Sequence, residues 1–592
     1  MNIEELLLEG LEKGIKSIYT TEIERSSIQL QITRKEFEGD YTALIFPLAK
    51  SIKRAPEEIA QKIGEYLLEY LPQVKSFNVV KGFLNISMND SYWLSILKMI
   101  VASNSWGEHP STGREVMVEF SSPNTNKPLH LGHIRNILLG WSLSNLLEAN
   151  GDKVVKVNLV NDRGIHICKS MVAKKLLGPN DTPQKSDIKG DHFVGKYYVA
   201  FNDLYKKEIE KEVARGVERE VAEIEAPILK EAQEMLRKWE RGESETIDLW
   251  REMNGWVYEG FDTTYRRLGV SFDQIYYESN TYLLGKELVE QGLKRGLFEQ
   301  REDHSIWCDL SDDGLDNKLL LRSDGTSVYI TQDLGTAHQR FTQYNLDEHI
   351  YVVGNEQIYH FQVLKLILKK MGFEWANSIY HMSYGMVELP DGKMKSREGT
   401  VVDADDLIDK MVATAAQSSN QSGKLSDMDS LEREQLFSTI ALGALKYFII
   451  KVDPKKTILF NPEESIDFNG NTGPFIQYTH ARIKSILRRG EGLGYRGKLD
   501  SSPINNRERE IIKLLYNYPQ KIKEGAAGHS PAVIANYCYD LAKEFNQYYH
   551  ETSILGESDR GILLQRLQLI ETIALVLSNG MKILGIELPE RM

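Results

Sequence analysis

The chain has 592 residues, of which 41% are hydrophobic and 27% are charged, and this length and composition predict several globular domains. Its formal net charge of −13 excludes a nonspecific nucleic-acid coat, because such binding depends on neutralising phosphates. Any nucleic-acid site is therefore expected to be local. No stretch approaches the roughly 20 apolar residues of a membrane span.

The first residues predict an amphipathic helix rather than a signal peptide. Ile3, Leu7, Leu11 and Ile15 recur at helical spacing, and a basic leading segment is missing. We therefore expect a cytoplasmic protein. The three cysteines lie far apart and give neither a disulfide framework nor a CxxC pair, so we expect them to be buried structural residues. They are Cys168, Cys308 and Cys538.

Residues 1–112 are predicted to form a small α+β domain. Pro56 suits the first turn of a helix in which Ile59 and Ile63 share one face. The run VVKGFLNISM, residues 79–88, has the composition of a strand. A polar segment, NSWGEHPSTG, then ends the domain.

Residues 113–400 are predicted to form a Rossmann-like domain. A strand at EVMVEF, a helix over 133–150 and a strand at KVVKVNLV make a βαβ unit, the building block of a parallel sheet. The same pattern resumes at HIYVVG and a helix from about residue 357. Between the two parts we predict a helical insertion over about 180–320, whose mixed charges are typical of a solvated helix surface.

The rest of the chain is expected to be helical. A polar stretch near residue 420 interrupts the connecting region, 401–464, and an all-α domain follows over 465–592. The predicted fold class is thus multidomain α/β, with an N-terminal α+β domain and a C-terminal all-α domain.

The segment NTNKPLHLGHIRN, residues 124–136, lies where the first strand of the βαβ unit runs into its helix. Three interpretations compete: a metal site built on His130 and His133, a simple helix start, or a phosphate cradle. A zinc site would need further ligands that the neighbouring sequence does not supply. A helix N-terminus after a parallel strand carries unpaired N–H groups and binds nucleotide phosphates in such sheets, so the phosphate cradle is favoured, with Gly132 allowing close approach.

HLGH resembles the first signature of the class I aminoacyl-tRNA synthetases, and Lys393, Met394, Lys395, Ser396 and Arg397 resemble the second. The wording VEFSSPNTNKPLHLGHIRN is similar to the arginyl-tRNA synthetases in particular. That resemblance extends over almost the whole chain, from GFLN in the first domain through SDGTSVYITQD to YDLAKEFNQYY and the ending LGIELPERM.

The resemblance implies ATP-dependent activation of L-arginine and its transfer to the 2′-OH of the terminal adenosine of tRNA(Arg). Arginine would be bound by residues that match family positions, and a guanidinium is best held by carboxylates. ATP would be bound with Mg²⁺, with no tightly bound cofactor and no protein metal site. The implied arginine-binding residues are Glu119, Asn124, Tyr329, Asp333 and Gln357; the implied ATP-binding residues are His130, Gly132, His133, Lys393, Met394 and Ser396.

One position departs from the family pattern. Ser396 stands where the second signature usually has a phosphate-binding lysine. In family members with this loss a lysine just upstream of the histidine motif is thought to substitute, and Lys127 occupies that place. Lys127 therefore joins His130, His133, Lys393 and Lys395 as an expected catalytic residue. We also expect arginine activation to require bound tRNA.

Partners follow from the same resemblance: tRNA(Arg), L-arginine and ATP, no membrane, and a monomeric enzyme. In the first domain Phe83 and Asn85 match positions that grip a base of the tRNA D-loop. In the helical domain Tyr478 and Arg482 belong to a local basic segment that suits phosphates of the anticodon stem. Two other classes remain open: a different adenylate-forming nucleotidyltransferase, and a catalytically silent tRNA-binding relative.

Overall fold

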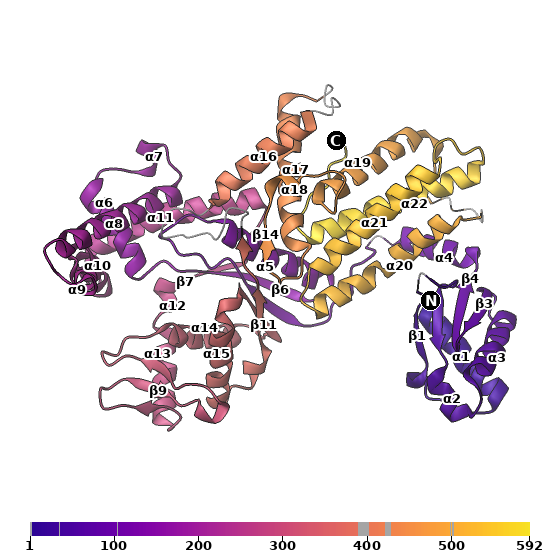
Figure 1. Ribbon diagram of the computed structural model, residues 1–592, viewed down its shortest axis with the longest axis horizontal. Helices are drawn as coiled ribbons and strands as arrows, with labels where there is room; N and C mark the ends of the chain where they lie inside the picture. The colour runs from indigo at the N-terminus through magenta and orange to yellow at the C-terminus, as the bar shows by residue number, and fades with distance from the viewer. Residues whose placement is uncertain are drawn as a thin grey trace. The chain divides into compact units, whose positions relative to one another are not determined.

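The computed structural model describes residues 3–34, 36–103, 105–388, 402–420, 428–497, 499 and 503–592 (Figure 1). The chain forms two compact units, each assembled from separated segments. The first unit contains Met1–Trp106, Ile486–Asn517 and Lys543–Ala574, and the second contains Gly107–Ser485, Tyr518–Ala542 and Leu575–Met592.

The N-terminal part of the first unit is a four-stranded antiparallel sheet with strand order β1-β2-β4-β3. Helix α1 buries Ile3, Leu7, Leu11 and Ile15, as the sequence period predicts. The carboxylate of Asp40 accepts the backbone N–H of Met88 at 2.6 Å. The elements are α1 (Ile3–Tyr19), β1 (Gln29–Ile32), β2 (Tyr41–Leu44), α2 (Phe46–Ile52), α3 (Pro56–Tyr70), β3 (Val74–Val80), β4 (Phe83–Met88) and α4 (Asp90–Ala102).

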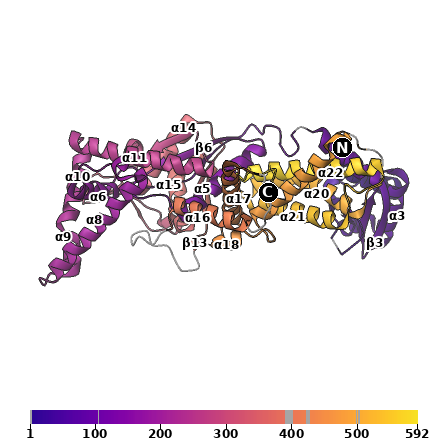
Figure 2. The same ribbon diagram turned by 90° about the horizontal axis from the view of Figure 1, so that it is seen from above.

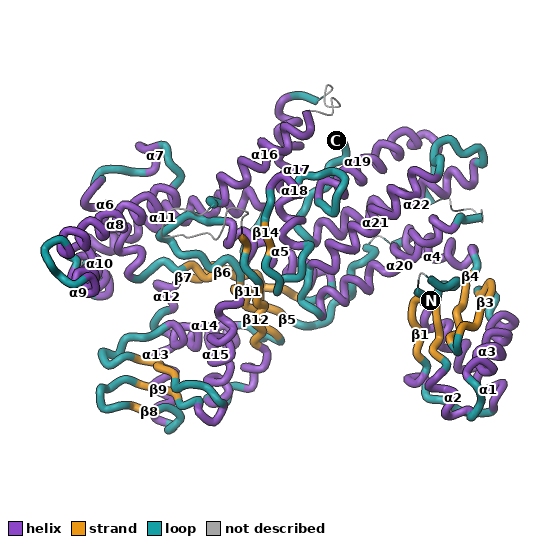
Figure 3. Tube along the Cα trace, viewed as in Figure 1, coloured by secondary structure: helices purple, strands orange, loops and turns teal. Residues whose placement is uncertain are grey.

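The second unit is built around a five-stranded parallel sheet with the order β12-β11-β5-β6-β7 (Figure 3). Its strands are β5 (Glu115–Glu119), β6 (Lys153–Val160), β7 (Gln274–Tyr277), β11 (Glu348–Gly354) and β12 (Ile379–Tyr384). The crossover helix α5 (Leu131–Ala149) is buried along most of its length and on most of its faces, as is typical of a helix enclosed in a protein core. The Rossmann-like parallel sheet is confirmed.

The insertion, expected to be helical over about 180–320, contains strands in its second half. The run of long helices ends at Leu268, and β7 then joins the central sheet by pairing with β6. The short run at 274–277 is an edge strand that pairs with β6 alone, and a run of that length carries no periodic signal. A second excursion follows, with α12 (Glu278–Thr281), α13 (Leu284–Lys294) and the antiparallel strands β8 (Glu299–Gln300), β9 (Ile306–Cys308) and β10 (Lys318–Leu321).

The helical part of the insertion packs as a bundle in which α6, α8 and α10 lie side by side (Figure 2). The bounds are α6 (Ile165–Leu177), α7 (Pro183–Ser186), α8 (Gly190–Val213), α9 (Arg219–Glu225), α10 (Pro227–Glu240) and α11 (Ser244–Leu268). After the excursion the chain returns through α14 (Tyr329–Gln343) and α15 (Ile358–Lys370).

The C-terminal third is helical, as predicted, apart from β14, which pairs with β13. The remaining elements are β13 (Val387–Glu388), α16 (Ala404–Asn420), α17 (Ser430–Ile450), β14 (Ile458–Leu459), α18 (Pro462–Ser465), α19 (Gly473–Gly490), α20 (Asn506–Ala527), α21 (Ala532–Glu551) and α22 (Arg560–Ile583).

Helix α22 corrects the expectation that no stretch approaches a membrane span. By length and composition alone it could cross a membrane, but 61% of its apolar window is buried inside the protein. A core helix of a folded domain has this character. All three cysteines are buried, as expected.

Candidate active site

The order of the central sheet defines a crevice. From β5 the chain moves through α5 to β6 on one side, whereas β11 and β12 lie on the other side of β5. The carboxyl ends of β5 and β11 therefore flank a topological switch point, where α/β sheets bind their ligands. Glu119 is the last residue of β5, and Gln357 lies just beyond the end of β11.

The backbone leaves β5 through two strained residues. Ser121 and Ser122 have φ angles of 76° and 43°, in the left-handed region that disfavours side chains. Buried amides hold the turn: Ser121 N–H donates to Asn136 Oδ1 at 2.5 Å, and Ser122 N–H donates to Asn158 Oδ1 at 3.0 Å. Asn136 Nδ2 also donates to Val352 O at 2.7 Å, so one side chain ties α5 to both strands of the crevice.

The two signature histidines cap the N-terminus of α5. His130 Nδ1 accepts the backbone N–H of Gly132 at 3.1 Å, and His133 Nδ1 accepts the backbone N–H of His130 at 3.1 Å. The rings lie 3.9 Å apart between centroids. A Cβ at Gly132 would stand 3.0 Å from His130 Cε1. The glycine thus makes room for the His130 imidazole; the expected close approach of the nucleotide at Gly132 stays a prediction.

Both imidazoles are neutral at physiological pH. Burial and, to a smaller extent, the charge of Lys127 lower the pKa of His130 to about 4, against the opposing influence of Asp403. Burial also lowers the pKa of His133 well below its usual value. Since each Nδ1 accepts a hydrogen bond, each proton must reside on Nε2. The site therefore offers two Nε2–H donors beside a helix N-terminus.

A cavity of about 240 Å³ opens beside this motif. It is lined by Lys127, Pro128, Leu129 and His130 on one side and by residues of α8 on the other. Residues next to the second signature also reach this place: Leu131 N–H donates to Val402 O at 3.1 Å, and Ala404 N–H donates to Leu129 O at 3.0 Å. Lys393, Met394, Lys395, Ser396 and Arg397 themselves lie outside the described residues.

Glu119 is not free to receive a ligand on its own. It forms an ion pair with the guanidinium of Arg340, which is fully buried. Burial raises the pKa of Glu119, Arg340 opposes that rise, and the nearby charge of Asp333 adds to it. The sequence did not suggest this partner, because Arg340 lies 221 positions away along the chain on the inner face of α14.

Tyr329 and Asp333 lie one turn apart on α14, which confirms the predicted helical spacing. Tyr329 is 76% exposed and, with Asn124, lines a second cavity of about 550 Å³. The Asp333 carboxylate contacts His360 Nε2 at 2.6 Å and is partly exposed. Gln357 is exposed and lines neither of these two cavities.

Two residues that line the larger cavity, Arg163 and Glu278, and their neighbour Asp162 were missed by the sequence reasoning. Buried Asp162 accepts hydrogen bonds from Tyr258 Oη at 2.8 Å and from Ser279 Oγ at 2.7 Å, which fixes the edge of β6. Arg163 pairs with Glu240 at 3.0 Å. Burial raises the pKa of Glu278 to about 7, although Arg163 opposes the shift. Their position directly after β6 and β7 is the signal that a strand-end search would have found.

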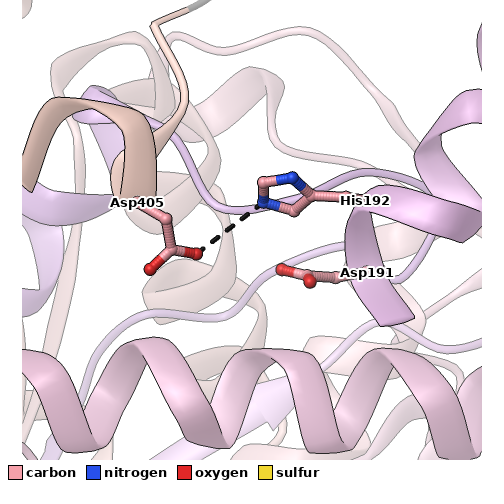
Figure 4. Close-up of side chains that lie close together, drawn as sticks. All are labelled: Asp191, His192 and Asp405. Carbon is pink, nitrogen blue, oxygen red and sulfur yellow. Dashed lines mark ion pairs between the residues drawn. The ribbon is translucent and has the colours of Figure 1, made fainter. Parts of the chain in front are cut away.

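Asp191, His192 and Asp405 form a cluster close to the smaller cavity (Figure 4). His192 Nε2 lies 3.2 Å from Asp403 Oδ2 and 3.7 Å from Asp405 Oδ2, and hydrogen bonds to these carboxylates raise the pKa of His192 to about 10. Lys189 Nζ bridges Asp191 at 3.2 Å and Asp405 at 2.6 Å. The carboxylates are thus neutralised by the chain's own cations, and the cluster is an ion-pair network.

The two residues of the N-terminal sheet that are predicted to contact tRNA, Phe83 and Asn85, have different surroundings. Asn85 is buried in the sheet, where its amide accepts from Thr42 Oγ1 at 2.6 Å and donates to Asn78 Oδ1 at 2.8 Å. Both polar ends of the side chain are thus engaged within the sheet, and its expected contact with an RNA base stays a prediction. Phe83 is half-buried and forms an edge-on ring pair with Phe46, which is 46% exposed.

In the helical region the guanidinium of Arg482 lies 4.9 Å from the centre of the Tyr478 ring. Both residues lie on α19, one turn apart, and both are half-buried. The pair is thus a stacked unit on a helix surface.

Three family models match three successive parts of the chain. Residues 95–461 match the family model described as tRNA synthetases class I (R), catalytic domain. Residues 5–88 match the arginyl tRNA synthetase N-terminal domain, and residues 476–592 match the DALR anticodon binding domain.

Relatives match over the full length. The chain is 52% identical to the arginine–tRNA ligases of Bacteroides thetaiotaomicron and Porphyromonas gingivalis, with 100% of both chains covered. Among solved structures, the arginyl-tRNA synthetase of Thermus thermophilus aligns with a TM-score of 0.79 at 26% identity, covering 100% of each chain. A methionyl-tRNA synthetase of Mycobacterium tuberculosis shares the fold alone, with a TM-score of 0.51 at 10% identity, covering 81% of this chain and 92% of that one.

Proposed function

Because this chain belongs to the class I arginyl-tRNA synthetase family and is an ATP-dependent arginine–tRNA ligase, we propose how its residues divide the two steps of that reaction. In the first step a carboxylate oxygen of arginine attacks the α-phosphorus of ATP. The bond between that phosphorus and the bridging oxygen breaks, and pyrophosphate leaves. In the second step the 2′-OH of the terminal adenosine of tRNA attacks the activated carbonyl, and AMP leaves.

His130 and His133 stabilise the transferring phosphate. Their Nε2–H groups are neutral donors held in place by backbone hydrogen bonds, so they need no reorganisation when negative charge develops on the phosphate oxygens. The N-terminus of α5 adds its partial positive charge. Lys127 contributes a full positive charge at the cavity beside His130. The assignment of the first step depends on this single observation, the pair of histidines that cap α5.

Asp333 is the carboxylate that binds the substrate guanidinium. It is partly exposed on the same face of α14 as Tyr329, whereas Glu119 is already paired with Arg340. Glu119 then supports the pocket by keeping Arg340 in place and by adding negative potential near Asp333. Asn124 and Tyr329 share one cavity and would contact the α-amino side of the substrate, with Gln357 near it.

The remaining assignments rest on the family. MgATP is the nucleotide substrate, and Lys393, Met394, Lys395 and Ser396 contact its phosphates. Phe83 stacks on a base of the tRNA D-loop, and the Arg482 and Tyr478 pair contacts the anticodon stem. The enzyme is a cytoplasmic monomer that activates arginine only with tRNA bound. Its parts are an N-terminal domain over 1–112, a catalytic domain over 113–400, a connecting region over 401–464 and an anticodon-binding domain over 465–592.

Charging of total tRNA with each labelled amino acid in turn tests the proposal. Arginine alone should become attached, and attachment should depend on ATP. Attachment of another amino acid would overturn the pocket assignment, and the absence of any charging in the presence of tRNA binding would favour the silent tRNA-binding relative.

A further inference from the structure

The cavity beside the histidine motif has two walls. One wall is the segment that carries Lys127 and His130, and the other is a face of α8 that carries His192, Lys196 and Tyr198. His192 and Lys196 are four residues apart, so they share one face of the helix. Helix α8 comes from the insertion, far along the chain from the signature segment.

Close packing brings the walls together at Gly195. A Cβ at this position would stand 2.8 Å from Pro128 Cδ and 3.7 Å from Lys127 Cα. The backbone of α8 therefore lies directly against the signature segment, one residue before Lys196. Any larger residue at 195 would push the two walls apart.

The ion-pair network also holds α8 in place. Figure 4 shows three of its residues, Asp191, His192 and Asp405. His192 on α8 pairs with Asp403 at 3.2 Å, and the backbone of Asp403 forms a β-bridge with His130. Asp405 is held in turn by Lys189 at 2.6 Å and by Arg267 at 2.9 Å. These contacts leave α8 little freedom to rotate relative to His130.

The charges around the cavity favour an anion. Lys127 and Lys196 are cations, His130 is neutral, and the positive His192 is balanced by Asp403. Lys196 is exposed, and within the residues that the structure describes it forms no ion pair; its ammonium lies 5.9 Å from the centre of the Tyr197 ring. The cavity is thus lined by one lysine on each wall, together with His130 and the Asp403 that pairs with His192.

We propose that Lys196 is a further catalytic residue, whose ammonium binds the β- and γ-phosphate oxygens of ATP opposite Lys127 and stabilises the departing pyrophosphate. The inference rests on the proposed function, because it places the phosphates of ATP at the His130 side of this cavity. As the bond from the α-phosphorus to the bridging oxygen breaks, negative charge grows on pyrophosphate. Two ammonium groups from opposite walls would stabilise that charge without a further proton transfer.

The test is ATP–pyrophosphate exchange, measured with tRNA(Arg) present, on wild-type enzyme and on the variants Lys196→Ala and Lys196→Arg. Loss of one charge-assisted contact should lower kcat/KM for ATP in Lys196→Ala by roughly 10- to 100-fold. Lys196→Arg should recover most of that loss, while KM for arginine changes less than about twofold. Inhibition of charging by added pyrophosphate should weaken in the alanine variant.

The matched control is Lys207→Ala. Lys207 is exposed on the same helix, three turns further along, outside the cavity, and it should leave all these constants unchanged. Phosphates of tRNA are the other possible source of the anion: a rise in KM for tRNA with an unchanged KM for ATP would overturn the proposal.

Failure of the proposed function is distinguishable from failure of this inference. If Lys196→Ala behaves like Lys207→Ala while His130→Asn and Lys127→Ala lose exchange, then Lys196 has no catalytic role and the proposed function stands. If all four variants exchange normally, the phosphate assignment at this cavity is itself wrong. Equal thermal unfolding midpoints for wild type and Lys196→Ala establish that any loss is not a loss of folding.

Discussion

The Nδ1 atom of His133 accepts a hydrogen bond from the backbone N–H of His130 at 3.1 Å. This contact makes a signature histidine part of the helix cap, and it also decides which nitrogen carries the proton. Because Nδ1 is an acceptor in both rings, both Nε2 atoms are donors. One short pattern thus caps the helix and leaves two hydrogen-bond donors at its N-terminus.

The tautomer predicts an ordering of substitutions at His133. Glutamine places an amide N–H near the position of Nε2, whereas asparagine reaches only the position of Nδ1. His133→Asn should therefore keep the cap but lower kcat of adenylate formation by about 10²- to 10³-fold, the usual effect of losing one preorganised donor. His133→Gln should lose less. Steady-state exchange kinetics check the order, and the reverse order would place the reactive proton on Nδ1.

The depressed pKa values predict how stability varies with pH. His130 has a pKa of about 4 in the folded protein, against about 6.5 for an unfolded histidine. Between those pH values the unfolded chain binds more protons than the folded protein. The contribution of His130 to the free energy of unfolding is therefore complete above pH 6.5 and is lost as the pH drops toward 4. Unfolding midpoints at pH 7 and pH 5 should differ less in His130→Gln than in wild type. His304→Gln, at an exposed site, should keep the wild-type difference.

The buried pair of Glu119 and Arg340 predicts a double-mutant result. Glu119→Gln leaves the Arg340 guanidinium unpaired inside the protein and should destabilise it by about 3–5 kcal/mol. The double variant Glu119→Gln with Arg340→Met removes both charges and should regain much of the stability. Chemical unfolding of wild type, both single variants and the double variant measures the coupling. Additive losses would mean that the two side chains do not interact.

Asp333→Asn should weaken the binding of arginine without weakening the binding of ATP. Removing the carboxylate that we propose faces the substrate guanidinium should raise KM for arginine by about 100-fold, since charged hydrogen-bonded pairs contribute about 1.5–3 kcal/mol, with KM for ATP nearly unchanged. Asp312→Asn, an exposed acidic site elsewhere in the same unit, is the control. An equal rise in both KM values would indicate that Asp333 supports the fold rather than the substrate.

A substitution of Lys127 tests whether this residue compensates for Ser396, which stands where the second signature usually has a lysine. If Lys127 supplies the missing positive charge, Lys127→Ala should lower kcat/KM for ATP by at least tenfold, as expected for a lost ionic contact. Intact adenylate formation would contradict the compensation. The same assay run on wild type without tRNA tests the second expectation, since strong exchange in its absence would show that activation does not need tRNA.

The sequence predicted the elements that carry strong local signals. The helix after HLGH begins at Leu131, close to its predicted start, and Tyr329 and Asp333 share a helix face as expected. It could not predict β7, because four residues are too few for a period. It also could not pair Glu119 with Arg340 or foresee the burial of Asn85, since both depend on neighbours that only tertiary packing brings together.

The two left-handed serines after β5 constrain how this enzyme could be made more heat-resistant. Each non-glycine residue in that conformation costs roughly 1–2 kcal/mol, so glycine at 121 or 122 is an evident choice for an engineer seeking thermostability. Ser121 Oγ, however, also lies 2.6 Å from Tyr265 Oη, and glycine would remove that contact and free the turn that shapes the crevice. A substitution in this turn that raises the thermal stability of the enzyme is therefore expected to lower its turnover rate.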